Sequence, residues 1–587
     1  MEHLETSKDE DAKTGHKTAD TSFWGYKTHV AMTEERIITA ATITSGEKID
    51  GKELPKLVQK SKAAGIQIES VIGDMAYSEK TNIEAAKKGL KPIVFDENAK
   101  PGGQLFKQIH KFFGSKEHKA KVRGFKIGED LLSEAEEYGV EVILNATVVG
   151  LYPEKEVTVK VGDSVKHYKG DAILVATGAS ENMVNFEGWT KPGVIGAGAA
   201  QTMMNLHHIK PGNRILMLGS GNVGLVVSYQ LLQAGCEVVA LADAAPRVGG
   251  YGVHAAKIAR CGVPFYLSHT IVRVEGGDAV TGVVIGQIGS DWKIIPGTEK
   301  HFDVDTVCLA VGLSPMSQLL KQAEVKMNDT KGGHVPEIDK YGATSVPGIY
   351  AAGDVSGIEE ASSAMIEGRM SGASIACYLG YMTEEERDAR IEELENQLET
   401  LRQGMFAPKN RGKLVEKTDE GIDVSMNLLN KGFVADDEIE RFPGVTHQKG
   451  IHPVIECTQN IPCNPCQDAC KMGCIRIGKN ITSLPAIDEE KKCIGCGMCV
   501  ASCSGQSIFL VEEDVEPGFG EVTMPYEFLP VPKVGDKGIA LGRNGKEVCK
   551  AEVTKVRTAP AFDHTNLLTI KVPNDMVMKA RFYKKKA

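Results

Sequence analysis

The spacing of nine cysteines between Cys457 and Cys503 constrains this chain more than any other feature of its sequence. The last four follow C-x2-C-x2-C-x3-C, a pattern in which three closely spaced thiolates hold one [4Fe–4S] cluster and the fourth reaches a second cluster. A preceding run, "CTQNIPCNPCQDAC", has a longer first gap and supplies the partner set. Crossed ligation predicts two [4Fe–4S] clusters, the first held by Cys457, Cys463, Cys466 and Cys503 and the second by Cys470, Cys493, Cys496 and Cys499.

A pair of zinc sites is the alternative for this segment, but zinc normally takes two separated C-x2-C pairs with a long spacer. The segment resembles the bacterial two-cluster ferredoxin, with two departures: Lys471 and Ser504 stand where proline usually follows the last cysteine of a run. The resemblance implies an electron conduit without substrate chemistry of its own. Cys474 is left over and is expected to pack as a small residue.

A glycine-rich turn between two apolar strands predicts a dinucleotide site in the middle of the chain. The stretch reads "RILMLGSGNVGLVVSYQLLQAGCEVVALAD". Gly219, Gly221 and Gly224 permit a tight turn, close approach of backbone to a pyrophosphate, and close helix–strand packing. Asp243 would bond the adenosine ribose, which favours NAD, while the nearby Arg247 leaves NADP open.

Further strand ends around this module predict a second nucleotide site. "PIVFDENAKPGGQL" offers Glu97 as a ribose acid and a glycine pair for close approach. "DAILVATGA" ends in a turn of small residues, and "SVPGIYAAGDV" ends in an acid that can bond flavin ribityl or phosphate-adjacent oxygens. The residues predicted to bind FAD are Glu97, Gly102, Gly103, Gln104, Thr177, Gly178, Gly353 and Asp354.

In this order the segments resemble the pyridine nucleotide–disulfide oxidoreductase superfamily over about residues 84–380, with an NAD module inserted into an FAD module. "DENAKPGGQLFKQIHKFFGS" and "APRVGGYGVHAAKIA" are similar to the α subunits of multi-subunit amino-acid dehydrogenases: sarcosine oxidase, proline and hydroxyproline dehydrogenase, and hydrogen cyanide synthase. The superfamily's redox-active C-x-x-C disulfide is missing, because Cys236 and Cys261 stand alone, so we do not expect disulfide reduction.

The first glycine-rich turn of the FAD module is absent from the sequence. Gly73 is followed by Met75 and Ser78 where the other two glycines would fall, and Asp74 adds a charge of the same sign as a phosphate. The residues upstream resemble the middle of an insertion-sequence DDE transposase, in which Asp74 maps to one of three metal-binding carboxylates. No segment supplies the other two, so a two-metal site is not expected. Our hypothesis is that a transposase fragment has replaced the first strand and turn; an unusual N-terminal domain is the alternative.

The predicted fold class is α/β, with two interleaved Rossmann-like dinucleotide-binding domains. An α+β two-cluster ferredoxin domain, a small C-terminal β unit and an N-terminal transposase-like (RNase H-like) fragment complete it. The predicted divisions are 1–83 transposase-like, 84–205 first FAD segment, 206–310 NAD-binding, 311–380 second FAD segment, 381–450 helix and linker, 451–515 ferredoxin and 516–587 β unit. Apolar residues in Thr383–Gly404 cover under two heptads, which favours a packed surface helix over a dimerising coiled coil.

The formal net charge of −10 argues against a dedicated nucleic-acid binder. With no apolar run of about 20 residues and no secretory signal, we expect no membrane span and a cytoplasmic location.

The expected function is an FAD- and NAD(P)-linked iron–sulfur oxidoreductase that passes electrons between nicotinamide or an electron carrier and an amino-acid-oxidising partner subunit. No acid–base pair stands out, so catalytic residues stay unassigned. The alternatives are a glutamate-synthase-like NAD(P)H electron-input subunit, a fusion with impaired flavin binding, and a DDE transposase.

Overall fold

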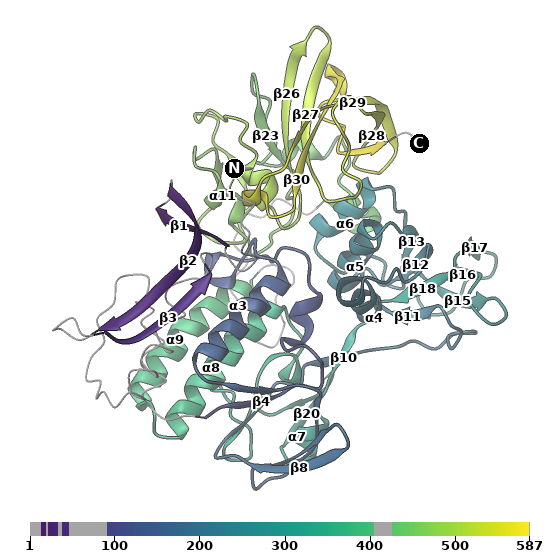
Figure 1. Cartoon of the computed structure of the whole chain (residues 1–587). Coiled ribbons are helices and arrows are strands. Elements are labelled where there is room, and N and C mark those ends of the chain that lie inside the picture. The colour runs from purple at the N-terminus through teal and green to yellow at the C-terminus, as the bar shows by residue number, and fades with distance from the viewer. Residues whose placement is uncertain are drawn as a thin grey trace. The chain divides into compact units, whose positions relative to one another are not determined.

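The computed structural model describes residues 91–330, 332–403 and 425–585, together with three N-terminal strands. Those strands, β1 (Lys13–Thr18), β2 (Thr21–Met32) and β3 (Ile38–Ser45), form an antiparallel sheet in the order β1-β2-β3 (Figure 1). The chain divides into two units: residues 1–101 with 129–147, and residues 102–128 with 148–587. The transposase resemblance stays a prediction, and the missing turn at Gly73, Met75 and Ser78 lies outside the described residues.

Five parallel strands form the central sheet of the NAD module, within the second unit (Figure 1). Helices connect the first four of these strands in the chain, whereas the connection to the last runs through antiparallel strands; parallel pairing requires such long crossovers. In sheet order the strands are β11 (Val194–Gly196), β18 (Thr306–Leu309), β12 (Arg214–Leu218), β13 (Glu237–Asp243) and β14 (Phe265–Leu267). The helices are α4 (Ala197–Gln201), α5 (Asn222–Gln233) and α6 (Gly252–Arg260).

Both faces of this sheet are buried, which explains its continuous apolar strands. Along β12, Ile215 and Met217 pack with helix residues such as Leu225, whereas Leu216 and Leu218 pack on the opposite face. That opposite face is covered by an antiparallel sheet of β15 (His269–Glu275), β16 (Gly282–Gln287) and β17 (Lys300–Asp303). The α/β prediction with a Rossmann-like module is confirmed here.

The segments around the NAD module form small sheets of their own. In the second unit β9 (Ile173–Val175) runs parallel to β22 (Ile349–Ala351), and β10 (Ala179–Glu181) runs antiparallel to β19 (Leu313–Pro315). In the first unit β4 (Ile93–Phe95) runs parallel to β5 (Glu141–Ile143). The remaining elements are α3 (Gly124–Glu137), β6 (Ala146–Leu151), β7 (Glu156–Val161), β8 (Ser164–Lys169), α7 (Gln318–Gln322), β20 (Met327–Thr330) and β21 (Gly333–Pro336).

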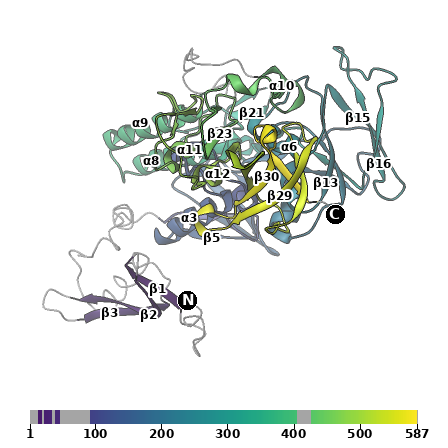
Figure 2. The ribbon, with the colours of Figure 1, turned by 90° about the horizontal axis from the view of Figure 1, so that it is seen from above.

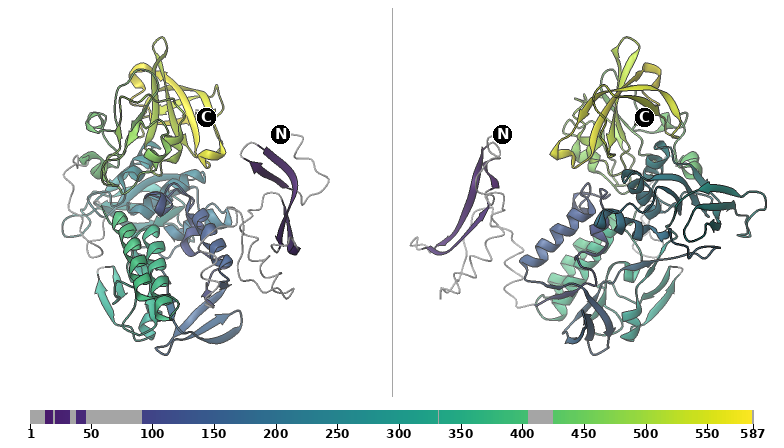
Figure 3. Two further views of the ribbon diagram at one scale, coloured as in Figure 1. Left: turned by 90° about the vertical axis from the view of Figure 1, so that its left-hand side faces the viewer. Right: turned by 45° about the vertical axis from the view of Figure 1, so that its right-hand side comes forward.

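The helices α8 (Ala361–Tyr378) and α9 (Glu384–Leu401) lie side by side (Figure 3). Thr383 caps α9: its hydroxyl oxygen accepts a hydrogen bond from the backbone N–H of Glu386, whose carboxylate accepts from the N–H of Thr383. The predicted apolar positions of α9 pack against α8. The buried residues of this contact are Ile366, Met370, Ile391, Leu394 and Leu398. The expectation of a packed helix is confirmed.

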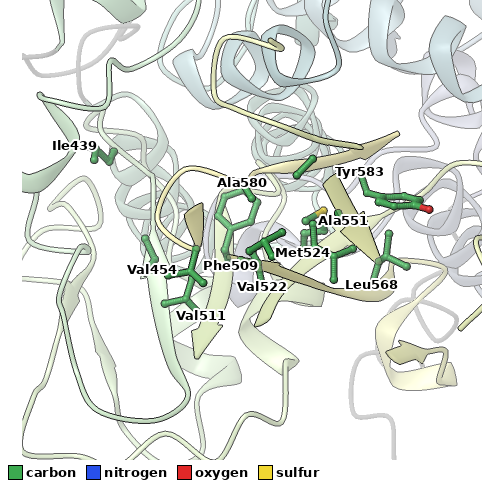
Figure 4. Close-up of a cluster of buried hydrophobic side chains, with 14 of the residues drawn as sticks. Ile439, Val454, Phe509, Val511, Val522, Met524, Ala551, Leu568, Ala580 and Tyr583 are labelled. Carbon is green, nitrogen blue, oxygen red and sulfur yellow. The ribbon is translucent and has the colours of Figure 1, made fainter. Parts of the chain in front are cut away.

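A seven-stranded antiparallel sheet forms the C-terminal region, with a core that includes Phe509, Met524 and Leu568 (Figure 4). In sheet order the strands are β23 (His452–Ile455), β26 (Ile508–Glu516), β27 (Phe519–Tyr526), β30 (Asn566–Pro573), β29 (Glu547–Arg557), β28 (Lys537–Leu541) and β31 (Phe582–Lys585). The predicted division between residues 515 and 516 therefore falls inside β26. The sheet continues across it because β26 pairs with strands on both sides of that division.

The cysteine segment is an insertion between the hydrogen-bonded neighbours β23 and β26. Before it lies α10 (Met426–Lys431), and within it lie α11 (Pro465–Ala469), β24 (Ile475–Arg476), β25 (Ala486–Ile487) and α12 (Met498–Ser502). Helix α12 contacts β30 of the sheet (Figure 2). Among the described residues, no helix combines the length and apolar character needed to cross a bilayer.

Candidate functional site

The glycine-rich turn joins β12 to α5 as predicted. Gly219 has a φ of +113°, and a Cβ atom there would lie 2.2 Å from the carbonyl oxygen of Ala310. A Cβ on Gly224 would lie 2.1 Å from the carbonyl oxygen of Gly219, so the fold itself requires both glycines. A Cβ on Gly221 would meet nothing within 4 Å. The space beside Gly221 is open at the N-terminus of α5, where backbone N–H groups favour a phosphate.

Asp243, at the end of β13, reaches back to this turn. Its Oδ2 accepts hydrogen bonds from the backbone N–H and the hydroxyl of Ser220, each at 2.5 Å, and its Oδ1 accepts from the N–H of Ala245 at 2.7 Å. The Ser220 hydroxyl oxygen also accepts from the N–H of Gly249 at 3.0 Å. The predicted ribose acid therefore also holds the turn in shape, while Arg247 is exposed to solvent.

One side chain connects this turn with the second predicted nucleotide site. Asn222 Nδ2 donates to the Glu360 carboxylate at 2.9 Å, and Asn222 Oδ1 accepts from the backbone N–H of Tyr251 at 2.8 Å. Glu360 precedes α8 and follows Asp354 by six residues. The NAD turn and the Gly353–Asp354 motif thus lie in one region of the second unit.

Gly353 adopts a φ of +75°, and its N–H donates to Glu367 Oε2 at 2.9 Å. Asp354 Oδ1 accepts a hydrogen bond from the N–H of Glu359 at 3.2 Å. Both glutamates are held by Arg402 at the end of α9, which donates to Glu359 at 2.8 Å and to Glu367 at 2.7 Å. The three side chains are at most 12% exposed. Sequence reasoning missed this support, because no local pattern connects Arg402 to residues 35 and 43 positions away.

Replacing Arg402 by methionine is expected to destabilise the chain by about 3–5 kcal/mol, because it removes a buried cation that bonds two buried carboxylates. Thermal unfolding of the purified protein measures this. Arg390→Met on the same helix is the matched control, since its ion pair with Glu393 is solvent-exposed and worth about 0–1 kcal/mol. Equal effects of the two substitutions would contradict the assigned role of Arg402.

The other predicted FAD residues of the second unit lie at two turns. Gly102 has a φ of +107°, and a Cβ on it would lie 2.0 Å from the Phe106 ring; nothing stands within 4 Å of a Cβ on Gly103. Gln104 is exposed. The Thr177 hydroxyl donates to the carbonyl of Met316 at 2.7 Å, and Gly178 has a φ of +69° with open space beside it. In the first unit, Glu97 follows β4 and is exposed.

The first predicted set of four cysteines lines one cavity. The wall comprises Cys457, Cys463, Cys466 and Cys503 together with apolar residues such as Phe113 and Val253. Burial raises the pKa of the Cys457 thiol, and the nearby thiols of Cys503 and Cys466 raise it further. The backbone N–H of Ser507 donates to the Cys503 sulfur at 3.4 Å. Thiols 46 residues apart in the sequence are therefore gathered as the crossed pattern requires.

The second set is also gathered, but nearer to solvent. Burial raises the pKa of the Cys499 thiol, with further contributions from Cys493, Cys470 and Cys496. Cys496 is exposed, whereas Cys474, the leftover cysteine, is buried and donates its N–H to the Cys470 sulfur at 3.3 Å. These are the four cysteines that the crossed pattern assigns to the second cluster.

Within the described residues, no three His, Cys, Asp or Glu side chains stand in an arrangement that would hold a metal ion. The chemistry of the donors nevertheless fits an iron–sulfur cluster, because each set offers thiols alone, and N–H groups point at Cys493 and Cys503. Glu456, directly before the first cysteine, is held between Arg543 and Arg581, which fixes the entry to the insertion.

A group of buried charges beside Cys503 was missed by sequence reasoning. Helix α6 carries His254, Lys257 and Arg260 at intervals of three residues, and all three are at most 6% exposed. That spacing places basic residues along one side of the helix. This spacing could have revealed the buried group from the sequence, because three basic residues at helical spacing inside an apolar segment require buried partners.

Comparison with known proteins agrees with these motifs. Residues 78–368 match the sequence model of the family described as pyridine nucleotide-disulphide oxidoreductase. An opine oxidase subunit of Rhizobium meliloti is 28% identical over 58% of this chain and 70% of its own length. The hydrogen cyanide synthase subunit HcnB of Pseudomonas aeruginosa is 24% identical over 52% of this chain and 70% of its own length. The alpha subunit of sarcosine oxidase from Corynebacterium is 25% identical over 51% of this chain, but only 31% of that subunit is covered.

Proposed function

We propose that this chain, whose residues 78–368 match the pyridine nucleotide-disulphide oxidoreductase family, is an electron-transfer subunit carrying FAD, NAD(P) and two [4Fe–4S] clusters. One observation carries the proposal: four cysteines of the insertion line a cavity together with Phe113 and Val253, which belong to the nucleotide-binding region of the chain. An electron relay needs such adjacency between its iron–sulfur and nucleotide regions.

FAD and NAD(P) supply hydride chemistry when bound, and the clusters supply one-electron steps. The residues of the chain bind and orient these groups. The N-terminus of α5 beside Gly221 would take the nicotinamide dinucleotide pyrophosphate, and Asp243 would take the ribose while holding the turn through Ser220. Gly353, Asp354 and the open turn at Gly178 would take the flavin. The eight cysteines Cys457, Cys463, Cys466, Cys470, Cys493, Cys496, Cys499 and Cys503 would hold the clusters.

We further propose a partner subunit that oxidises an amino acid or a related amine. Three relatives are named as subunits of oxidases or synthases, which supports a multi-subunit assembly. The sequence offers no motif of an acid–base pair for substrate oxidation, so this proposal places that step on the partner. A cytoplasmic location belongs to the proposal as well, since thiol ligands need a reducing compartment.

Anaerobic purification of the full chain tests this function directly. The expected result is brown protein with about eight iron atoms per chain and NADH-dependent reduction of a one-electron acceptor dye. Flavin is measured separately by its fluorescence after release. Colourless, iron-free protein would overturn the proposal.

As the alternative, we propose a fusion in which a transposase-derived N-terminal fragment impairs FAD binding. The family match begins at residue 78, the last of the three positions where the glycines of the expected first turn would fall. Met75 and Ser78 stand at the second and third of these positions.

Changing Met75 and Ser78 together to glycine is therefore expected to tighten FAD binding roughly tenfold, because it clears the approach of backbone to pyrophosphate. Titration of flavin-free protein with FAD, followed by flavin fluorescence, measures the affinity of both chains. A near-stoichiometric yield of tightly held FAD from the unaltered chain would show that the first turn is not needed.

A further inference from the structure

A cavity lies against Cys503, on the side of the first cysteine set that faces the NAD module. Its wall is formed by residues 109–111, by α5 and α6, by the turn Cys503–Gln506 and by Glu527. The Tyr229 hydroxyl donates to Gln506 Oε1 at 2.8 Å, which fixes the turn after the cysteine. The cavity therefore connects a predicted cluster ligand with helices that carry buried charges.

Positive charge exceeds negative charge around this cavity. Four basic side chains are at most 7% exposed: Lys111, Arg123, Lys257 and Arg260. They face two carboxylates, Glu527 and the half-exposed Asp563. Both carboxylates are bonded to Arg123, at 3.1 Å each. Buried charge of one sign calls for a compensating charge nearby.

Lys257 is the cation of this group that lacks a hydrogen-bond acceptor among the described residues, although the charge of Glu527 acts on it. Lys111 uses its three donors on the carbonyls of Ala501 and Phe562 and on Thr565, at 2.7–2.9 Å. Arg260 donates to the carbonyl of Gln506 at 2.7 Å. The Lys257 ammonium instead lies over the Tyr229 ring, 4.1 Å from its centre, and has no hydrogen-bond acceptor among the described residues. Only 2% of Lys257 is exposed.

We infer that Lys257 is the counter-charge of the first iron–sulfur cluster and sets its reduction potential above that of the second. This rests on the proposed function. A [4Fe–4S] cluster with four thiolates is anionic, and adding one electron makes it more so without forming or breaking a bond. A buried cation stabilises the reduced state more than the oxidised state, because the charges interact across a medium of low dielectric constant.

The surroundings of the second set differ. Cys496 is exposed, and so are the two lysines beside this set, Lys491 and Lys492. The half-buried Arg557 also lies beside it, but its guanidinium already donates to the carbonyls of Gly495 and Cys496, at 3.1 and 3.2 Å. Water and salt screen the two exposed lysine charges within about 10 Å. The two clusters are thus expected to differ in potential, with electrons resting on the cluster nearer the nucleotide module.

The test is a redox titration of the anaerobically prepared full chain, with dithionite as reductant and electron paramagnetic resonance as readout. Lys257→Met keeps the side-chain length and removes the charge. It is expected to lower the midpoint potential of one cluster by at least tenfold in the reduction equilibrium constant, about 59 mV for one electron, and to leave the other unchanged. Lys492→Met, next to a ligand of the second set, is the control and is expected to move neither potential.

Gln230→Glu provides a second route to the same result. Gln230 is 3% exposed, lines the same cavity, and its Nε2 has no hydrogen-bond partner within the described ranges of the chain. A carboxylate there would neutralise Lys257 without deleting it, so the same cluster should shift in the same direction. Unchanged potentials in iron-replete variants, or equal shifts of both clusters, would overturn the inference. Loss of iron from both variants would do so too, because it would show a structural role. Iron-free wild-type protein would instead overturn the proposed function.

Discussion

Replacing Cys466 by serine is expected to remove one iron–sulfur cluster and leave the other, so that iron falls from about eight to about four atoms per chain. Cys466 lines the cavity of the first set, and a serine hydroxyl is a poor substitute for a thiolate ligand. NADH-driven reduction of an external acceptor should fall at least a hundredfold if that cluster lies on the electron path. Iron analysis and the paramagnetic resonance spectrum of the reduced protein measure the result.

The crossed assignment of cysteines to clusters is tested by comparing which cluster signal each cysteine variant loses. Cys503→Ser should abolish the same signal as Cys466→Ser, although Cys503 belongs to the later run, whereas Cys470→Ser should abolish the other. Cys474→Ser is the matched control, because Cys474 lies in the same segment but belongs to neither set, and it should keep the full iron content. If Cys466 and Cys470 variants lost the same signal, each run would hold its own cluster and the crossed arrangement would be wrong.

Gly221→Val is expected to weaken NAD(H) binding roughly a hundredfold, about 2.7 kcal/mol, without lowering the melting temperature. A Cβ at this position meets no atom within 4 Å, so the fold tolerates a side chain there. The added methyl groups would occupy the approach of the pyrophosphate to the N-terminus of α5. Calorimetric titration with NADH measures the affinity.

Gly277→Val is the control for this substitution, because Gly277 is also free of neighbours within 4 Å and lies in the turn between β15 and β16. Its NADH affinity and melting temperature should both match those of the unaltered chain. Undiminished affinity in the Gly221 variant would place the dinucleotide elsewhere.

The features that could be predicted from the sequence are those encoded over a short stretch. The strand, glycine turn and helix around Gly219 follow from an apolar run and three glycines, and the structure shows two of those glycines in contact with backbone that leaves no room for a Cβ. The packing of α9 followed from the spacing of its leucines. Local backbone geometry and steric exclusion depend on residues that are close together in the sequence, so a short stretch is enough to predict them.

Features that depend on distant residues could not be predicted in this way. The ion pairs of Arg402 with Glu359 and Glu367 join two helices through residues far apart in the chain. The pairing of β23 with β26 spans the whole cysteine segment, so the predicted division between residues 515 and 516 falls inside a continuous sheet. Lys257 becomes informative only when the surrounding acceptors can be counted in three dimensions.

Because the cysteine segment is inserted between the paired strands β23 and β26, it can be added to the sheet or removed from it without changing the order of the strands. Paired strands stand about 4.8 Å apart, so the sheet holds the two ends of the inserted loop together. The entropic cost of closing the loop rises slowly with its length, by about 0.6 kcal/mol for each doubling. Arg543 and Arg581, which lie next to strands β28 and β31 of the sheet, donate hydrogen bonds to the Glu456 carboxylate at the start of the inserted segment. The cysteine segment could therefore be gained, exchanged or lost at this junction while the β-sheet keeps its pairing.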